Sequence, residues 1–365
     1  MKTNLVKEIH QYGQSIWLDF IDRKLMHSGE LKSLIEVDGI RGITSNPAIF
    51  EKAISSSNDY AKQIGELSKT HSNNEDIFYA LAIKDIREAT DFFKPLYDEK
   101  EVGSDGYVSL EVSPFLARDT QKTIHQALDL WKQVDRKNVM IKIPGTKEGL
   151  PAITKTISEG LNINVTLLFG LKRYEEVAEA YIKGLEIRHK EGKPLSNISS
   201  VASFFLSRID VIIDPILIEK GHPELKGEVA IASAKMAYQI YKKVFHSERF
   251  KELKKHGARP QRLLWASTGS KDPQFSDTKY VDALIGPETV NTIPMETLLA
   301  FKDHGKPANR LESDLVGAEM TITGLSKMGI SLDEITKKLE DEGIEKFNKP
   351  YEKLLLAIET EKNKK

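Results

Sequence analysis

The stretch Asn138–Thr146, with the sequence NVMIKIPGT, places one lysine inside a short apolar run that closes on a Pro-Gly turn. Such a run is typical of a buried strand. Helical patterns flank it in sequence, so both faces of the strand should be covered, and a charged Lys142 there would carry a large desolvation cost. Either the side chain reaches water at the strand end, or the amine is kept neutral, as a Schiff-base nucleophile requires.

Strand patterns alternate with helical patterns along the rest of the chain. We predict eight strands, at residues 15–20, 39–44, 106–112, 138–143, 161–169, 197–203, 262–267 and 280–286. Neither a dinucleotide-binding glycine fingerprint nor a Walker pattern is present, so the alternation favours an α/β fold of the (β/α)8 TIM barrel type. We expect a single domain over residues 1–365, with a helical elaboration at about 184–260 and C-terminal helices at about 312–360.

Polar side chains end six of the predicted strands, and a barrel would gather them at one mouth. They are Asp19, Asn46, Glu111, Lys142, Thr166 and Ser203. Individually, some have a structural alternative: Asp19 could cap a helix at 20–26, and Asn46 could cap the helix that begins at Pro47. Two further caps are predicted, Asp119 for the next helix and Ser331 with Glu334 as a capping box.

Composition excludes several classes of function. The 53 basic and 54 acidic residues leave a net charge of -1, which gives no reason to expect a nucleic acid or membrane partner. Cysteine is absent, which rules out disulfides, thiolate zinc sites and cysteine nucleophiles. The nine histidines form no HxH or HExxH pair, so we expect neither a metal nor another cofactor.

The first residues, Met1–Val6, lack the apolar core of a signal peptide, and no window has the length of a membrane span. A cytoplasmic protein is therefore expected. The sequence does not decide the oligomeric state, for which a homodimer is one expectation.

A central amine with nearby carboxylates suits carbonyl chemistry, in which the iminium formed on Lys142 acts as an electron sink for carbon-carbon cleavage. The amine must be unprotonated to attack. A carboxylate beside it would oppose this, so we expect the acids to act through water or at a distance.

Four motifs resemble the transaldolase family, in the bacterial type of the class I Schiff-base aldolases. They are GITSNP at 42–47, SLEV at 109–112, VMIKIP at 139–144 and NINVTLLF at 162–169, in family order on successive strands. The resemblance covers about Trp17 to His304. It implies an enzyme of the pentose phosphate pathway that moves a dihydroxyacetone unit between phosphorylated sugars.

The resemblance also implies residue roles. Lys142 matches the Schiff-base lysine and Asp19 the base that takes the C4 hydroxyl proton. Glu111 matches the acid that acts through a water held with Thr166. The substrate-binding positions are Asn46, Asn164, Ser203 and Arg208, and the last two match the segment that binds the ketose end and the phosphate. For Arg208 alone, a surface salt bridge is the alternative.

The sequence departs from the family pattern after the seventh strand. An arginine usually follows the Ala-Ser pair, whereas this chain has Ala266-Ser267-Thr268-Gly269-Ser270-Lys271. Phosphate binding could use Ser267 and Lys271, or backbone amides of the loop.

Two rival functions stay open. One is a fructose-6-phosphate aldolase-like enzyme that releases free dihydroxyacetone. Relatives of that kind tend to carry glutamine at the position of Glu111 and tyrosine at that of Phe205, so both residues favour transfer. The other is a non-catalytic phosphosugar-binding barrel, which would not need a neutral lysine.

Overall fold

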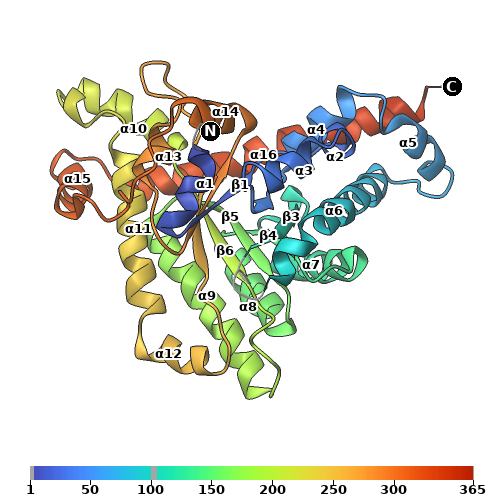
Figure 1. Ribbon diagram of the computed structural model, residues 1–365, viewed down its shortest axis with the longest axis horizontal. Coiled ribbons are helices and arrows are strands. Elements are labelled where there is room, and N and C mark those ends of the chain that lie inside the picture. The colour runs from blue at the N-terminus through green and yellow to red at the C-terminus, as the bar shows by residue number, and fades with distance from the viewer. Residues whose placement is uncertain (1–3, 100–104, 365) are drawn as a thin grey trace.

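The centre of the molecule is a closed barrel of eight parallel strands in sequence order, in which β8 also pairs with β1 (Figure 1). This computed structural model describes residues 4–99 and 105–364, so Met1–Thr3 of the segment Met1–Val6 lie outside the described residues. The predicted (β/α)8 TIM barrel is confirmed.

All eight strands are buried along their whole length, as expected for strands that are covered outside by helices and inside by their neighbours. They are β1 (Gln14–Leu18), β2 (Gly42–Ile43), β3 (Tyr107–Glu111), β4 (Val139–Pro144), β5 (Ile163–Leu168), β6 (Ser200–Phe205), β7 (Arg262–Ala266) and β8 (Thr289–Ile293). β2 is very short, and its glycine has a packing reason: a Cβ at Gly42 would lie 2.7 Å from the ring of Trp17.

The predicted eighth strand at 280–286 is wrong. Those residues begin in helix α13 (Lys279–Ala283), where Thr278 Oγ1 donates to Asp282 Oδ2 one helical turn later. The strand that closes the barrel is β8, whose alternate residues Thr289 and Asn291 are fully buried. Residues 280–286 are the more apolar segment, and this favours them as a strand. The true strand carries polar residues, which the interior of a barrel also accepts.

Helices surround the barrel and cover its outer face (Figure 1). They are α1 (Leu5–Ile9), α2 (Arg23–His27), α3 (Glu30–Glu36), α4 (Pro47–Ser55), α5 (Ala61–Leu67), α6 (Asn74–Asp98), α7 (Thr120–Val134), α8 (Gly149–Glu159), α9 (Leu171–Lys190), α10 (Ser207–Glu219), α11 (Val229–Phe245), α12 (Glu248–Lys255), α13, α14 (Met295–His304), α15 (Leu315–Lys327) and α16 (Leu332–Lys362). None of the helices within 4–99 and 105–364 is long and apolar enough to cross a membrane.

The two predicted helix caps are confirmed. Asp119 accepts a hydrogen bond from the backbone N–H of Lys122 at the start of α7, and Ser331 accepts one from Glu334 at the start of α16. Residues 184–260 hold the end of α9, strand β6 and helices α10 to α12, and residues 312–360 hold α15 and most of α16.

A buried carboxylate closes the amino-terminal end of the barrel. Asp105, just before β3, accepts hydrogen bonds from Ser15 Oγ at 2.7 Å and Trp17 Nε1 at 3.1 Å, and pairs with Arg41 and Arg262 at 2.8 and 3.0 Å. Burial alone would raise the pKa of Asp105, but the two guanidinium groups hold that pKa below its ordinary value. The buried Asp105 cluster of hydrogen bonds and ion pairs therefore closes this end of the barrel.

The carboxyl end of the barrel is crossed by α16, the long red helix of Figure 1, which packs against α4, α10 and β5. Close approach to β5 depends on Gly343, because a Cβ there would lie 3.0 Å from Leu167 Cδ2. The C-terminal helix thus lies over the mouth where catalytic groups of TIM barrels gather.

Candidate active site

A cavity of about 220 Å³ opens at the carboxyl ends of the strands. Eight of the ten residues expected from the sequence line it: Asp19, Asn46, Lys142, Thr166, Ser203, Arg208, Ser267 and Lys271. The other two lie directly behind this wall, where Glu111 contacts Lys142 and Asn164 contacts Ser203. The barrel therefore brings the whole predicted set together.

The amine of Lys142 is buried and held from two sides. Its Nζ lies 3.0 Å from Glu111 Oε2 and donates to the backbone oxygen of Ser45 at 2.8 Å. The expectation that the acids stand away from the amine is wrong for Glu111. The reason is strand register: Glu111 on β3 pairs with Lys142 on β4, so both side chains point into the barrel at one level.

The Glu111 carboxyl beside the amine has a perturbed pKa. Burial raises the pKa of Glu111, against the attraction of the neighbouring Lys142 charge. In a poorly solvated site, moving the shared proton from nitrogen to oxygen replaces two buried charges by two neutral groups. In the Schiff-base chemistry expected from the sequence, Glu111 is placed to accept the proton that Lys142 would lose before it attacks a carbonyl.

Asp19 lies on the cavity wall beyond the end of β1 and is partly exposed. It is not a helix cap, because the cap of α2 is Asp22. Thr44 Oγ1 donates to Asp19 Oδ1 at 2.7 Å and contacts Thr292 Oγ1 at 2.6 Å, so Thr292 is the donor in that second bond. Burial raises the pKa of Asp19, while Lys142 and the Thr44 hydrogen bond oppose the rise. An aspartate with a raised pKa suits a general base.

Asn46 caps a helix and also lines the cavity. Its Oδ1 caps α4 by accepting from the backbone N–H of Ile49 at 3.1 Å. Its Nδ2 makes no hydrogen bond to any residue that the structure describes, and the side chain lines the cavity. The cap fixes the orientation of the amide and leaves a donor for a ligand.

A short polar chain crosses the barrel interior below the cavity. Ser203 Oγ donates to Asn164 Oδ1 at 2.7 Å, and Asn164 Nδ2 donates to Ser109 Oγ at 3.1 Å. The amide of Asn164 is therefore fixed by its neighbours. Thr166 differs, because its buried Oγ1 has no hydrogen-bond partner among residues 4–99 and 105–364. Such an atom is suited to a water or substrate hydroxyl.

Cations stand on the side of the cavity formed by β6 and β7. Neither Arg208 nor Lys271 forms a hydrogen bond or ion pair with another described residue, although both line the cavity. Ser267 follows β7 with φ 55°, in the left-handed region, and its Oγ contacts Ser207 Oγ at 2.9 Å. The expected alternative of a surface salt bridge for Arg208 is not what the structure has.

Sequence reasoning missed several wall residues. Thr44 and Thr292 support Asp19, and Lys346, Phe347 and Pro350 come from α16. Thr44 belongs to the GITSNP motif, so the motif itself was a signal that could have identified it. The α16 residues carry only a helical pattern, which does not say where the helix packs.

Comparison with known proteins now decides the family. Residues 16–358 match the family described as Transaldolase/Fructose-6-phosphate aldolase. The chain belongs to this family. It is 49% identical to a transaldolase of Trichodesmium erythraeum, over 100% of this chain and 99% of that one.

Two further relatives agree. A transaldolase of Saccharopolyspora erythraea is 48% identical over 98% of both chains, and a protein named transaldolase 2 of Nostoc punctiforme is 47% identical over the same shares. The family expected from the motifs is confirmed, and the chain is an enzyme of the transaldolase type.

Proposed function

We propose that the enzyme transfers a dihydroxyacetone unit between phosphorylated sugars of the pentose phosphate pathway. The donor would be sedoheptulose 7-phosphate or fructose 6-phosphate, and the acceptor glyceraldehyde 3-phosphate or erythrose 4-phosphate. The observation that carries this proposal is the buried Lys142 amine held 3.0 Å from the Glu111 carboxyl beside a polar cavity. The names of the relatives support it.

The reaction begins when the neutral Lys142 amine attacks the ketose C2 carbonyl and forms a carbinolamine. Loss of water then gives an iminium. Glu111 accepts the amine proton and returns a proton to the leaving hydroxyl, directly or through a water held at Thr166. No cofactor is needed, because the protonated imine is itself the electron sink.

Cleavage follows when Asp19 removes the C4 hydroxyl proton and the C3–C4 bond breaks. The bonding electrons pass into an enamine on Lys142, and the remaining aldose phosphate leaves. The enamine then attacks the acceptor aldehyde, and hydrolysis frees the new ketose. Asn46 and the Asn164–Ser203 pair hold substrate hydroxyls in this scheme, while Arg208, Ser267 and Lys271 hold the phosphate end.

Borohydride trapping tests the mechanism. With fructose 6-phosphate, we expect reduction to fix a three-carbon adduct on Lys142, detected by peptide mass, and Lys142→Ala to abolish it. Asp19→Ala should still form the Schiff base with the intact donor but lose cleavage. No adduct, or an adduct that survives Lys142→Ala, would reject the proposed chemistry.

Transfer and simple cleavage are separated by the acceptor. We expect little free dihydroxyacetone when fructose 6-phosphate is supplied alone and fast turnover when erythrose 4-phosphate is added. Rapid release of dihydroxyacetone without acceptor would instead favour the aldolase reaction.

Location and assembly are part of the same proposal. Phosphorylated sugars are charged and do not pass freely through a lipid bilayer, so an enzyme that uses them belongs in the cytoplasm. We retain the expectations of a single folded domain and a homodimer. Sedimentation velocity at several protein concentrations tests the second, and a single cooperative calorimetric transition would agree with the first.

A further inference from the structure

The C-terminal helix contributes directly to the wall of the active-site cavity. α16 crosses the barrel mouth (Figure 1). Its residues Lys346, Phe347 and Pro350 line the same cavity as Lys142. A positive charge therefore reaches the site from a part of the chain about 200 residues beyond the lysine strand.

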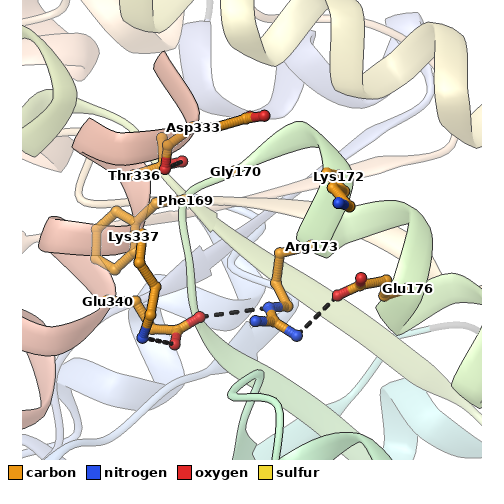
Figure 2. A pocket seen from close by; sticks show the side chains of 9 residues that line it. All are labelled: Phe169, Gly170, Lys172, Arg173, Glu176, Asp333, Thr336, Lys337 and Glu340. Atoms are coloured by element: carbon orange, nitrogen blue, oxygen red, sulfur yellow. Dashed lines mark hydrogen bonds and ion pairs between the residues drawn. The ribbon is translucent and has the colours of Figure 1, made fainter. Parts of the chain in front are cut away.

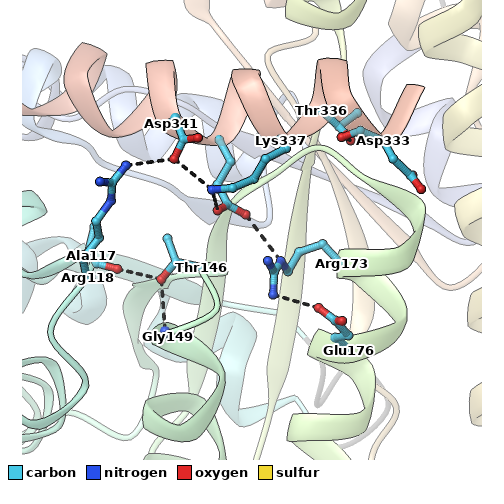
Figure 3. A network of polar contacts seen from close by, with 11 residues as sticks. Ala117, Arg118, Thr146, Gly149, Arg173, Glu176, Asp333, Thr336, Lys337 and Asp341 are labelled. Atoms are coloured by element: carbon cyan, nitrogen blue, oxygen red, sulfur yellow. Dashed lines mark hydrogen bonds and ion pairs between the residues drawn. The ribbon is translucent and has the colours of Figure 1, made fainter. Parts of the chain in front are cut away.

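The first half of α16 is tied to the start of α9 and to the segment that follows β3. Figure 2 shows the hollow between α16 and the start of α9, in which Glu340 pairs with Arg173 at 3.4 Å and with Lys337 at 2.9 Å. Figure 3 shows a second link, from Asp341 to Arg118 at 2.8 Å. Glu340 is buried, so its pairs are screened less than surface pairs.

These links, together with the close contact at Gly343, fix the position and rotation of α16. Lys346 follows Gly343 by three residues, which is nearly one helical turn. The two residues therefore lie on the same side of α16. Its place on the cavity wall is thus a consequence of packing and does not depend on a mobile tail.

Four basic residues line the cavity, and one of them is the lysine proposed to react with the substrate. Lys142 is the proposed nucleophile, which leaves Arg208, Lys271 and Lys346 to meet a negatively charged group. Burial raises the pKa of Asp19, and the charge of Lys271 is among the influences that oppose this rise. Burial lowers the pKa of Arg208, and the charge of Glu342 on α16 opposes this. Arg208 and Lys346 of α16 line the same cavity, and α10, which carries Arg208, packs against α16.

Glu342, on the same helix, is the ion-pair partner of Lys346. It lies 2.9 Å from Lys346 Nζ, and its charge also acts on Arg208. The side chains of Lys346 and Glu342 are 47% and 37% exposed, so water screens their pair and it contributes little stability. A dianion that entered the cavity could replace Glu342 as the partner of Lys346 at small cost.

We propose that Lys346 is a phosphate-binding residue of this enzyme and acts with Arg208 on the phosphate of the sugar substrate. It acts beside Ser267 and Lys271, which line the same cavity and which the proposed function also assigns to the phosphate end. The inference rests on the proposed function, because that function supplies a phosphorylated substrate. Arg208 offers a planar fork of donors and Lys346 a compact charge, a combination suited to a phosphate group.

The test compares Lys346→Gln with Lys338→Gln. Lys338 is a matched control, because it stands on the same helix and faces the same Glu342 at 3.8 Å but does not line the cavity. We expect Lys346→Gln to raise KM for fructose 6-phosphate about 10-fold or more, the effect of losing one hydrogen bond to a charged group. kcat should stay within about 2-fold, because the contact is equally present in substrate and transition state.

Two further readouts separate phosphate binding from a structural effect. Lys346→Arg should restore KM, and inorganic phosphate should inhibit Lys346→Gln less strongly than it inhibits the wild type. Borohydride trapping of unphosphorylated dihydroxyacetone on Lys142 should be unchanged in Lys346→Gln.

An unchanged KM in Lys346→Gln, an equal effect of Lys338→Gln, or an equal loss of dihydroxyacetone trapping would overturn the inference alone. A wild-type enzyme that traps no dihydroxyacetone would overturn the proposed function, and this inference with it.

Discussion

Lys142 Nζ and Glu111 Oε2 lie 3.0 Å apart on neighbouring strands, and both side chains are about 95% shielded from solvent. A buried ion pair of this kind adds little stability by itself, because desolvation of two charges offsets their attraction. In the proposed mechanism the pair instead serves proton transfer, because the Glu111 carboxyl, whose pKa burial raises, lies beside the amine that must lose a proton.

Glu111→Gln removes that proton acceptor and keeps the shape of the side chain. We expect kcat for transfer to fall about 100-fold or more, the usual contribution of a positioned acid or base. Stopped-flow or quenched trapping on Lys142 should locate the loss in Schiff-base formation. Glu111→Asp, which keeps a carboxyl, is the control and should retain more activity. Equal activity of the glutamine variant and the wild type would contradict the role.

Thr44→Val should change the pH dependence of cleavage. Asp19 must be ionised to act as a base, and its raised pKa predicts that the acid limb of kcat/KM lies above the ordinary aspartate value of about 3.9. The Thr44 hydrogen bond lowers that pKa, so its removal should shift the limb to higher pH.

Thr292→Val is the matched control for this shift, because Thr292 contacts Thr44 and not Asp19. The acid limb of kcat/KM should move less in Thr292→Val than in Thr44→Val. A limb that stays in place in Thr44→Val would exclude Asp19 as the group that titrates.

Asp105→Asn should destabilise the fold without touching the active site. Breaking a buried pair by removing one partner typically costs about 3–5 kcal/mol in the free energy of unfolding. Urea unfolding at neutral pH measures the loss, and trapping on Lys142 at low temperature should persist in the folded variant. A decrease in the free energy of unfolding below about 1 kcal/mol would show that the Asp105 cluster does not stabilise the fold.

The same variant makes a prediction about acid stability. The pKa of Asp105 is lower in the folded chain than its ordinary value, so its contribution is present above about pH 4 and is lost as pH falls through the lowered folded pKa. The difference between wild type and Asp105→Asn should therefore shrink on acidification below about pH 4. A difference that grows there would contradict the sign.

Gly343→Ala tests the close approach of α16 to β5. Alanine normally favours a helix over glycine by about 1 kcal/mol, but here the added Cβ would meet Leu167 Cδ2 at 3.0 Å. Gly324→Ala on α15 is the control, since only Met328 Cε comes near, at 3.8 Å. Calorimetry should show a higher Tm for Gly324→Ala and a lower one for Gly343→Ala. Equal gains would mean that the contact at Gly343 is not tight.

The sequence alone determined the features that depend on neighbouring residues. Asp119 and Ser331 cap their helices because each bonds a backbone N–H three residues further on. The strand that carries Lys142 was also predicted from its own residues, because a short apolar run that ends in Pro-Gly is typical of a buried strand. The resemblance of four motifs placed the site residues in family order, and all ten lie at or just behind one cavity.

Only the tertiary structure decided what depends on distant segments. The strand that closes the barrel is Thr289–Ile293 and not 280–286, because pairing with β1 and β7 selects it and no local signal does. Register between β3 and β4 brings Glu111 into contact with Lys142. The packing of α16 brings Lys346 into the cavity. Hydrophobic periodicity tells which face of a helix is buried, but it does not tell against what, and that is why the sequence left this cation unassigned.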